Sequence, residues 1–153
     1  LLASVTSAKP KIANYKFTTL NPNLGVAKYD DREITLADIP GLIENAHTGI
    51  GLGIKFLKHI ERCKTLLHLI DVNEKDIIKS YKLVRKELGK YSKNLLKKDE
   101  IIVFNKVDLI TKEDLEIKRK NFITKIKKDI LILSNLNKKM VSNLKSKFIK
   151  YVY

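Results

Sequence analysis

The sequence contains few of the residues that would place it in several large classes of protein. Its 153 residues include one cysteine, three prolines, six glycines and no tryptophan. The single cysteine, Cys63, excludes a framework of internal disulfides and is typical of a reducing compartment, which predicts a cytoplasmic protein. We expect Cys63 to be a small, half-buried side chain. No apolar run approaches the roughly 20 residues that a membrane-spanning helix needs, so we expect no transmembrane segment.

Acidic residues are also scarce. The 31 lysines and arginines outnumber the 17 aspartates and glutamates, which gives a formal net charge of +14. Such a charge favours RNA, ribosomes or anionic membranes as partners. An A/T-rich genome is an equally good explanation of the positive charge. Only four of the basic residues are arginines, and the rest are lysines, which have A/T-rich codons. We expect the lysine runs at 117–128 and 138–150 to be solvated helix faces, with RNA contact as the alternative.

Hydrophobic residues make up 44% of the chain, which is enough for one core, so we expect a single domain over residues 1–153. Apolar spacing predicts an antiparallel hairpin from 24–30 and 33–38, and buried strands at 65–71, 101–106 and 129–133. It predicts the tail of a helix at 1–9 and helices at 54–63, 74–91, 111–128 and 137–150, with loops at 10–23 and 39–53. We expect the helix at 111–128 to open at Thr111, with Asp114 three residues on as a capping partner. Strands that alternate with helices indicate an α/β fold with a largely parallel sheet, whose ligands bind at the carboxyl ends of the strands.

The second buried strand ends in the motif Asn105-Lys106-Val107-Asp108. A carboxylate such as Asp108 can accept the N1–H and N2 amino hydrogens that guanine presents side by side, and adenine lacks that pair of donors. The stem of Lys106 can lie flat against the purine, and Asn105 can bind the base edge. Ser134 ends the last strand, where backbone N–H groups can meet the base. These residues predict a guanine site.

A second motif lies upstream, where Asp38 ends a strand of the hairpin and is followed by Pro40 and Gly41. A carboxylate in that place can hold a metal ion, and the loop after it can sense what the metal binds. Thr18 and Thr19 lie in an earlier loop, where a threonine hydroxyl can ligate Mg²⁺ beside a γ-phosphate. Metal ligand, phosphate sensor and base reader thus come in the order that a GTPase needs.

Three long stretches carry a resemblance to a known family: AKPKIANYKFTTLNPNLGV, ADIPGLIENAHTGIGLGIKFLKHIERCKTLLHLIDV and FNKVDL. They resemble the GTPase domain of Obg-type bacterial ribosome-assembly proteins, densely over 1–72 and 100–110 and thinly over 111–153. The resemblance implies a P-loop NTPase-like (Ras-like) fold with helices on both faces of the sheet. It also implies a cytoplasmic monomer that binds GTP and GDP with Mg²⁺ and hydrolyses GTP. Its implied partner is the large ribosomal subunit, through rRNA or proteins, with a link to the stringent response and the cell cycle.

The resemblance also assigns roles to single residues. Thr19 is the expected Mg²⁺-linked threonine, Asp38 holds Mg²⁺ through water, and the Gly41 N–H contacts the γ-phosphate. Leu42 stands where many GTPases have a water-orienting glutamine, so we expect slow hydrolysis, and no side chain is assigned as a general base. The full set of implied nucleotide contacts is Ile39, Pro40, Gly41, Asn105, Lys106, Asp108, Ser134 and Asn135, and the implied metal contacts are Thr18, Thr19 and Asp38.

The phosphate-binding loop G-x-x-x-x-G-K-[ST] is absent from the sequence. Gly89-Lys90 does not fit it, because Val84 replaces the first glycine and Tyr91 follows the lysine, so we expect this pair on a helix surface. In the family the loop comes directly before the LLASV stretch, so we expect the chain to begin after the loop and after the strand that leads into it. That would leave unpaired strand edges between the strands ending in Asp38 and in residue 71.

The last base motif also departs from the family, because Ser134 is followed by Asn135 where alanine is usual. The missing loop keeps a second hypothesis open, in which the chain is a basic, non-catalytic module that binds RNA or the ribosome. Two further residues have alternative interpretations. We expect Asp71 to cap a helix or brace a loop rather than bind metal, and we expect His68 to be a packing or surface residue.

Overall fold

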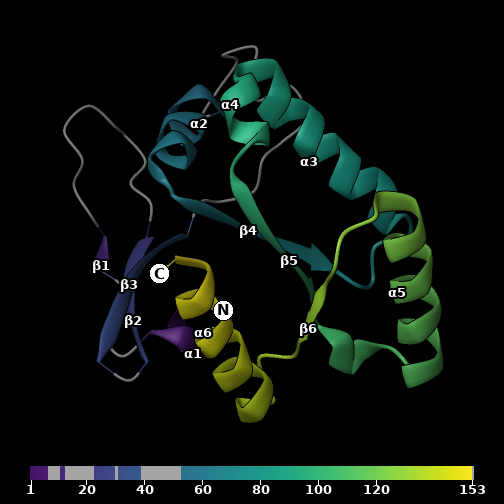
Figure 1. Cartoon of the computed structure of the whole chain (residues 1–153). Coiled ribbons are helices and arrows are strands. Elements are labelled where there is room, and N and C mark those ends of the chain that lie inside the picture. Colours follow the sequence, from purple (N-terminus) through teal and green to yellow (C-terminus); the bar gives the residue numbers. More distant parts are fainter. Residues whose placement is uncertain (7–10, 13–22, 30, 39–52, 153) are drawn as a thin grey trace.

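The computed structural model describes residues 1–6, 11–12, 23–29, 31–38 and 53–152 (Figure 1). Six residues with predicted roles lie outside the described ranges: Thr18, Thr19, Ile39, Pro40, Gly41 and Leu42. In chain order the elements are α1 (Leu2–Val5), β1 (Lys11–Ile12), β2 (Asn23–Tyr29), β3 (Arg32–Asp38), α2 (Gly53–Arg62), β4 (Thr65–Asp71), α3 (Ile77–Tyr91), α4 (Lys93–Leu96), β5 (Asp99–Asn105), the 3₁₀ turn η2 (Val107–Leu109), α5 (Lys112–Ile126), β6 (Leu131–Leu133) and α6 (Lys138–Val152).

The described strands form two sheets of three strands each. β1, β2 and β3 are antiparallel, which confirms the predicted hairpin of β2 and β3. Its register, which was not predicted, pairs Asn23 with Asp38 at one end and Tyr29 with Arg32 at the other. β4, β5 and β6 are parallel. The α/β class is therefore confirmed, but the strands divide between two sheets rather than one. Because β3 and β4 are not bonded neighbours among the described strands, the gap falls where the sequence predicted unpaired edges.

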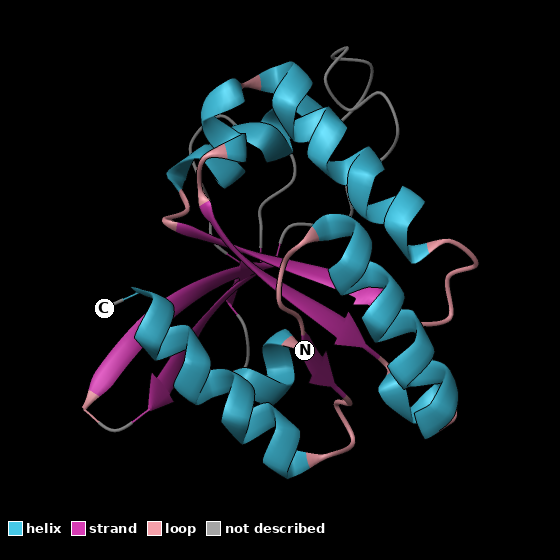
Figure 2. Cartoon of the chain, turned by 45° about the vertical axis from the view of Figure 1, so that its right-hand side comes forward, coloured by secondary structure: helices cyan, strands magenta, loops and turns pink. Residues whose placement is uncertain are grey.

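The helices cover both faces of the parallel sheet (Figure 2). On one face α3 and α5 pack against β5 through a core that includes Tyr81, Phe104 and Phe122. On the other face α6 packs against β5 and the antiparallel sheet through Val103, Leu133 and other apolar residues. Successive residues of β5 enter opposite cores, and the strand is buried on both faces as predicted.

β4 differs from its predicted burial on both faces. Ile70 is buried, but Leu69 is 39% exposed. The reason is topological, because among the described strands β4 is bonded to β5 on one edge and to none on the other. A strand at the margin of a sheet buries less of its surface than a central one. The strand at the other edge of this sheet, β6, is shorter than predicted, because it spans Leu131–Leu133 rather than 129–133.

Helix ends follow the local capping chemistry. Thr111 is the N-cap of α5 as predicted, and its hydroxyl accepts the Asp114 N–H at 3.1 Å. α3 begins at Ile77 rather than 74, because Asp76 caps it by accepting the Lys79 N–H at 2.8 Å. The patterns did not predict α4 or η2. No helix within the described residues is long and apolar enough to cross a membrane.

Candidate nucleotide-binding site

The carboxyl ends of β4 and β5 bring Asp71 and Asn105 side by side in the parallel register. The next residue, Lys106, has a left-handed backbone with φ of 63°, which turns the chain sharply out of the strand. Its ammonium donates to Asp71 Oδ2 at 2.6 Å, and Asp71 Oδ1 accepts the Asn73 N–H at 2.9 Å. Asp71 therefore braces both a loop and the motif at 105–108, which confirms the loop-bracing interpretation.

The ion pair shifts the pKa of each partner in the direction that favours its charged form. The hydrogen bond from Lys106, followed by that from the Asn73 backbone, lowers the pKa of Asp71 below its ordinary value. The hydrogen bond to Asp71 and then its charge raise the pKa of Lys106, with a smaller contribution from the carboxylate of Asp108. Both groups are ionised at neutral pH, so the Lys106 side chain is held across the ends of two strands.

Asn105 carries a buried amide oxygen, Oδ1, that has no hydrogen-bond partner among the described residues. Its backbone carbonyl accepts the Val72 N–H at 3.1 Å, which ties the two strand ends together. A buried acceptor without a donor costs about 1–3 kcal/mol. The atom therefore fits a site that receives a donor from a ligand or from a neighbouring segment.

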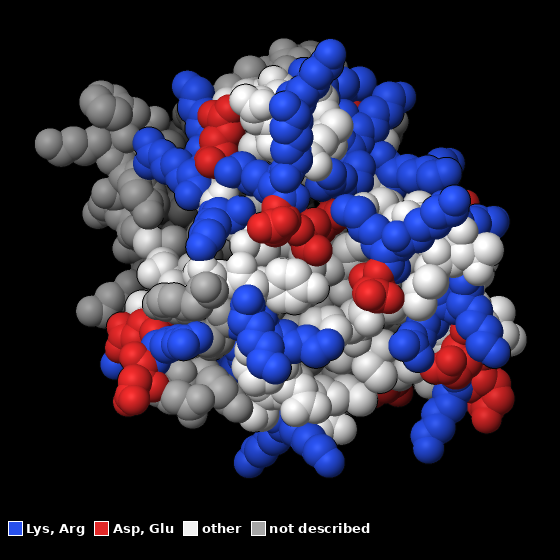
Figure 3. Space-filling view, in the orientation of Figure 1, with Lys and Arg blue, Asp and Glu red and all other residues white. Residues whose placement is uncertain are grey.

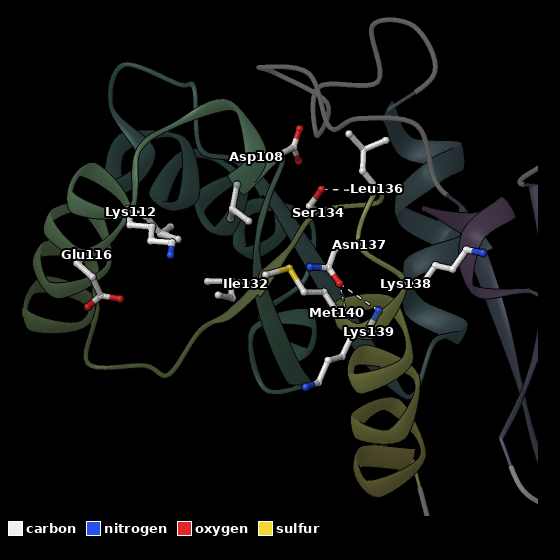
Figure 4. A pocket seen from close by; sticks show the side chains of 12 residues that line it. Asp108, Lys112, Glu116, Ile132, Ser134, Leu136, Asn137, Lys138, Lys139 and Met140 are labelled. Carbon is white, nitrogen blue, oxygen red and sulfur yellow. Dashed lines mark hydrogen bonds between the residues drawn. The ribbon is translucent and has the colours of Figure 1, made fainter.

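Asp108 lies in η2, directly after the turn at Lys106, and its side chain is exposed. Ser134 ends β6 and is buried, with its hydroxyl accepting the Leu136 N–H at 3.2 Å. Asp108 and Ser134 both line an open cavity of about 870 Å³, where Figure 4 draws them near each other. The structure thus brings together the two strand ends that the sequence assigned to the base. Asn135 is exposed.

The same cavity continues between α5 and α6, beyond the predicted base contacts. Lys112 and Glu116 extend toward it from α5, and Met140 lines it from α6 (Figure 4). Asn137 caps α6 there, because its Oδ1 accepts the backbone N–H groups of Lys139 and Met140 at 3.1 and 3.2 Å. This extension was not predicted, because it depends on how two helices distant in the sequence pack beside β6.

The predicted metal site is described in part. Asp38 is the last residue of β3, and its carboxylate is exposed. A carboxylate is a hard oxygen donor, and Mg²⁺ is commonly held by one or two carboxylates together with phosphate oxygens. The chemistry of Asp38 therefore fits Mg²⁺. No group of three or more His, Cys, Asp or Glu side chains within the described ranges is arranged to hold a metal by itself.

Sequence reasoning missed a second set of bracing hydrogen bonds near the motif at 105–108. The ammonium of Lys118, on α5, donates to the backbone carbonyls of Val72 and Glu74 at 2.7 and 3.3 Å. It fixes the loop after β4 against α5, beside the Asp71–Lys106 pair. No pattern distinguishes this lysine from the others of α5. By contrast, Lys90 of the Gly89-Lys90 pair lies on α3 and pairs with Glu87 at 3.2 Å, as expected of a helix surface.

A parallel sheet with helices on both faces and with polar residues gathered at its carboxyl edge is an α/β architecture, and it is the fold that solved GTPase domains share with this chain. A variant of Aquifex aeolicus Era bound to GDP·AlF₄⁻ matches with a TM-score of 0.70 and 20% identity, over 98% of this chain and 51% of that chain. The G domain of the T. maritima FeoB iron transporter matches with a TM-score of 0.67 and 20% identity, over 98% of this chain and 87% of that chain. At such identities the likeness establishes the fold.

The sequence comparisons establish the family. The family model described as "50S ribosome-binding GTPase" matches residues 1–106. The GTPase Obg of Pelagibacter ubique is 62% identical over 152 residues, which is 99% of this chain and 46% of that protein. The GTPase Obg of Ehrlichia ruminantium is 54% identical over 151 residues, which is 99% of this chain and 44% of that protein. The chain belongs to the 50S ribosome-binding GTPase family and matches the GTPase-domain portion of Obg proteins, and it spans less than half the length of these relatives.

Proposed function

We propose that the chain binds GTP and GDP with Mg²⁺, hydrolyses GTP slowly, and acts as a nucleotide-dependent switch in assembly of the large ribosomal subunit. The observation that carries the proposal is the base-reading motif at the end of β5, braced by the 2.6 Å Lys106–Asp71 pair beside an exposed Asp108. The name of the Obg relatives supports GTP hydrolysis, and the description of the matching family as a 50S ribosome-binding GTPase supports the ribosomal partner. A role in stress response or the cell cycle is a further part of the proposal.

Each residue of the motif has a separate task in this proposal. Asp108 accepts the N1–H and N2–H of guanine, and it is exposed at a cavity in which a ligand exchanges with solvent. Lys106 holds its stem across the strand ends, where a purine ring can lie against it, because its ammonium is anchored on Asp71. Asn105 supplies a buried acceptor that no described residue satisfies. Ser134 closes the edge at β6.

Asp38 would hold Mg²⁺, together with Thr19 or Thr18 from the first switch. When bound, the ion neutralises charge on the phosphate oxygens. The reaction is attack of water on the γ-phosphate, and the chain contributes by positioning the nucleotide. Leu42 has no polar group to orient that water, which is why we propose slow turnover. The Gly41 N–H, with Ile39 and Pro40 beside it, is proposed to contact the γ-phosphate.

The test is to exchange the base preference. Guanine offers two adjacent donors to Asp108, whereas xanthine has a carbonyl in place of the amino group and so matches an amide. We expect Asp108→Asn to weaken binding of fluorescent GDP with Mg²⁺ at least tenfold and to strengthen binding of the xanthine nucleotide. Asp129→Asn is the matched control, since Asp129 is exposed and outside the cavity, and it should change neither affinity. Equal loss of both nucleotides in Asp108→Asn would refute base reading by Asp108.

The second candidate is a basic RNA- or ribosome-binding module without catalysis. It is favoured by the net charge of +14 and by the exposed lysines of the helices. If the folded chain binds neither nucleotide but still binds RNA in a salt-dependent way, this function replaces the first.

A further inference from the structure

α3 presents a regular row of lysines on its outer face. Lys79, Lys82, Lys86 and Lys90 follow one another at spacings of three, four and four residues, and all are exposed. At about 100° per residue these positions fall within an arc of about 80°, and at 1.5 Å per residue they span about 16 Å. The opposite face of α3 is buried, through Tyr81 and other residues packed on the sheet. We call these four side chains the α3 lysine row.

Little negative charge accompanies the row. Lys90 pairs with Glu87, which is the sole acidic residue of α3 and is buried. Lys79, Lys82 and Lys86 form no ion pair with any side chain in the described part of the chain. Lys93 and Lys97, in and just after α4, add exposed positive charge beyond the end of α3. Figure 3 shows lysine and arginine side chains along the upper right of the molecule, where α3 runs in Figure 1.

The other basic helices lack this arrangement. α5 carries Glu113, Asp114 and Glu116 among its lysines, so its positive charge is interrupted. The lysines of α6 do not share one face of the helix. At about 100° per residue, positions 138, 139, 145, 147 and 150 cover a much wider arc than the α3 lysine row does. The lysine runs near the carboxyl end of the sequence are therefore less suited to a single linear partner than the α3 lysine row.

The chemistry of the row selects among polyanionic partners. Membrane-surface helices combine lysines with large apolar residues, and no large exposed apolar side chain lies on α3 among the described residues. Protein interfaces are depleted in lysine and enriched in aromatic residues and arginine. A nucleic acid backbone needs neither, since successive point charges can neutralise successive phosphates without reading the bases. The row fits a phosphate backbone better than a membrane or a protein.

We propose that the α3 lysine row is an RNA-backbone contact surface, independent of base sequence. It deepens the proposed function, on which it rests for the identification of the partner as ribosomal RNA. The row lies on the outer face of α3, whereas the base-reading motif lies at the carboxyl end of β5, so RNA and nucleotide contact different residues. One face of the chain would hold RNA while another exchanges nucleotide.

The test compares two triple variants of the chain with the same loss of charge. The first is Lys79→Gln, Lys82→Gln and Lys86→Gln. The matched control is Lys120→Gln, Lys125→Gln and Lys147→Gln, which removes exposed lysines from α5 and α6. The probe is a fluorescein-labelled, mixed-sequence single-stranded RNA, whose anisotropy is followed from 50 to 300 mM salt. Because each single-strand phosphate contact adds about 0.7 to the slope of log K against log salt, the α3 triple should reduce that slope by about 2.

We expect the α3 triple to weaken RNA binding at least tenfold at low salt and the control to weaken it less than threefold. A triple replacement of the same three α3 lysines by arginine should retain binding, which separates lost charge from lost structure. Equal losses in the two glutamine triples, or an unchanged α3 triple, would overturn the proposal. The proposal would also be overturned if the α3 triple lost binding to vesicles containing phosphatidylserine but retained RNA binding. Titration of the same variants with GDP distinguishes failure of this proposal from failure of the proposed function. If RNA binding depends on the α3 lysine row but the chain does not bind GDP, only the proposed nucleotide switch is refuted.

Discussion

Replacing Glu100 by glutamine should lower the free energy of unfolding by about 3 kcal/mol at neutral pH. Glu100 lies near the start of β5, and its side chain is 1% exposed. Its carboxylate accepts hydrogen bonds from His68 Nδ1 at 3.1 Å, Tyr81 Oη at 2.9 Å and Lys128 Nζ at 2.8 Å. The guanidinium of Arg85 lies 3.5 Å away. A glutamine in this place would present an amide donor to groups that are themselves donors.

The magnitude follows from the pKa of this carboxyl. Burial by itself raises the pKa of Glu100, but the hydrogen bonds from His68 and Lys128, the charge of Arg85 and the hydrogen bond from Tyr81 outweigh it and hold the pKa at about 2. A tenfold change in proton affinity is worth about 1.4 kcal/mol, so a fall from the ordinary 4.5 to about 2 contributes about 3 kcal/mol. This is a large part of the stability of a domain of this size.

The sign of the pH dependence is fixed by the lowered pKa. The contribution is fully present above the unfolded pKa of 4.5 and is lost as the pH falls toward about 2. The same pairing, after burial, raises the pKa of Tyr81, so that hydroxyl stays protonated and remains a donor through the physiological range. The difference in unfolding free energy between the parent chain and Glu100→Gln should therefore be constant from pH 7 to about pH 5 and shrink below it.

Urea unfolding followed by far-ultraviolet circular dichroism at several pH values measures this difference. Glu116→Gln is the control, because its 3.5 Å pair with Arg119 is exposed and is worth at most about 0.5 kcal/mol. A loss of under about 1 kcal/mol in Glu100→Gln at pH 7 would show that the cluster is not a net source of stability, as buried ion pairs sometimes are not. A difference that stays constant down to pH 3 would refute the reasoning from the pKa.

Three other substitutions test the packing and capping by the same unfolding assay. Thr111→Ala removes the N-cap of α5 and should cost about 1 kcal/mol, whereas Thr111→Ser should retain most of the stability. Phe122→Leu should cost about 1–2 kcal/mol, because the ring is fully buried and meets the Phe104 ring edge-to-face at 5.2 Å; a neutral result would mean that this core repacks freely. Gly25→Ala should cost about 1–3 kcal/mol, because the new methyl group overlaps the methyl group of Thr6. The Thr6 side chain is held in place, since its hydroxyl donates to the α1 backbone at 2.9 Å. A Gly25→Ala chain as stable as its parent would show that α1 moves away from β2.

The features that the sequence predicted correctly are those encoded locally. The α5 cap needs only Thr111 and the backbone three residues on, and the hairpin needs only alternating residues on either side of a turn. The alternation of buried residues in β5 likewise follows from one apolar run. The start of α3 was wrong by three residues because the N-cap is Asp76, inside the predicted helix, and apolar periodicity does not distinguish it from the equally suitable cap residues Asp71 and Asn73 upstream.

The features that sequence reasoning missed join residues that are distant in the chain. Lys106 and Asp71 are 35 residues apart, and their pairing depends on the parallel register of β4 and β5. The partners of Glu100 come from β4, α3 and the segment before β6, and His68, interpreted as a packing or surface residue, also bonds this carboxylate. Helical or strand periodicity contains no information about such pairs. The exposure of Leu69 depends on which strands flank β4, which is also a property of the assembled sheet.

Polar groups at the two ends of the parallel sheet differ in whether the fold itself supplies their partners. This difference distinguishes groups expected to stabilise the fold from groups expected to bind a ligand. At the amino end, the side chain of Glu100 is buried and its carboxylate is surrounded by donors from the chain itself. At the carboxyl end, Asp108 is exposed beside a cavity, and Asn105 has a buried oxygen without a donor among the described residues. Groups satisfied within the fold stabilise it, whereas unsatisfied groups gain most from a ligand. Substitution of Glu100 should therefore alter unfolding with little effect on base preference, and substitution of Asp108 should do the reverse.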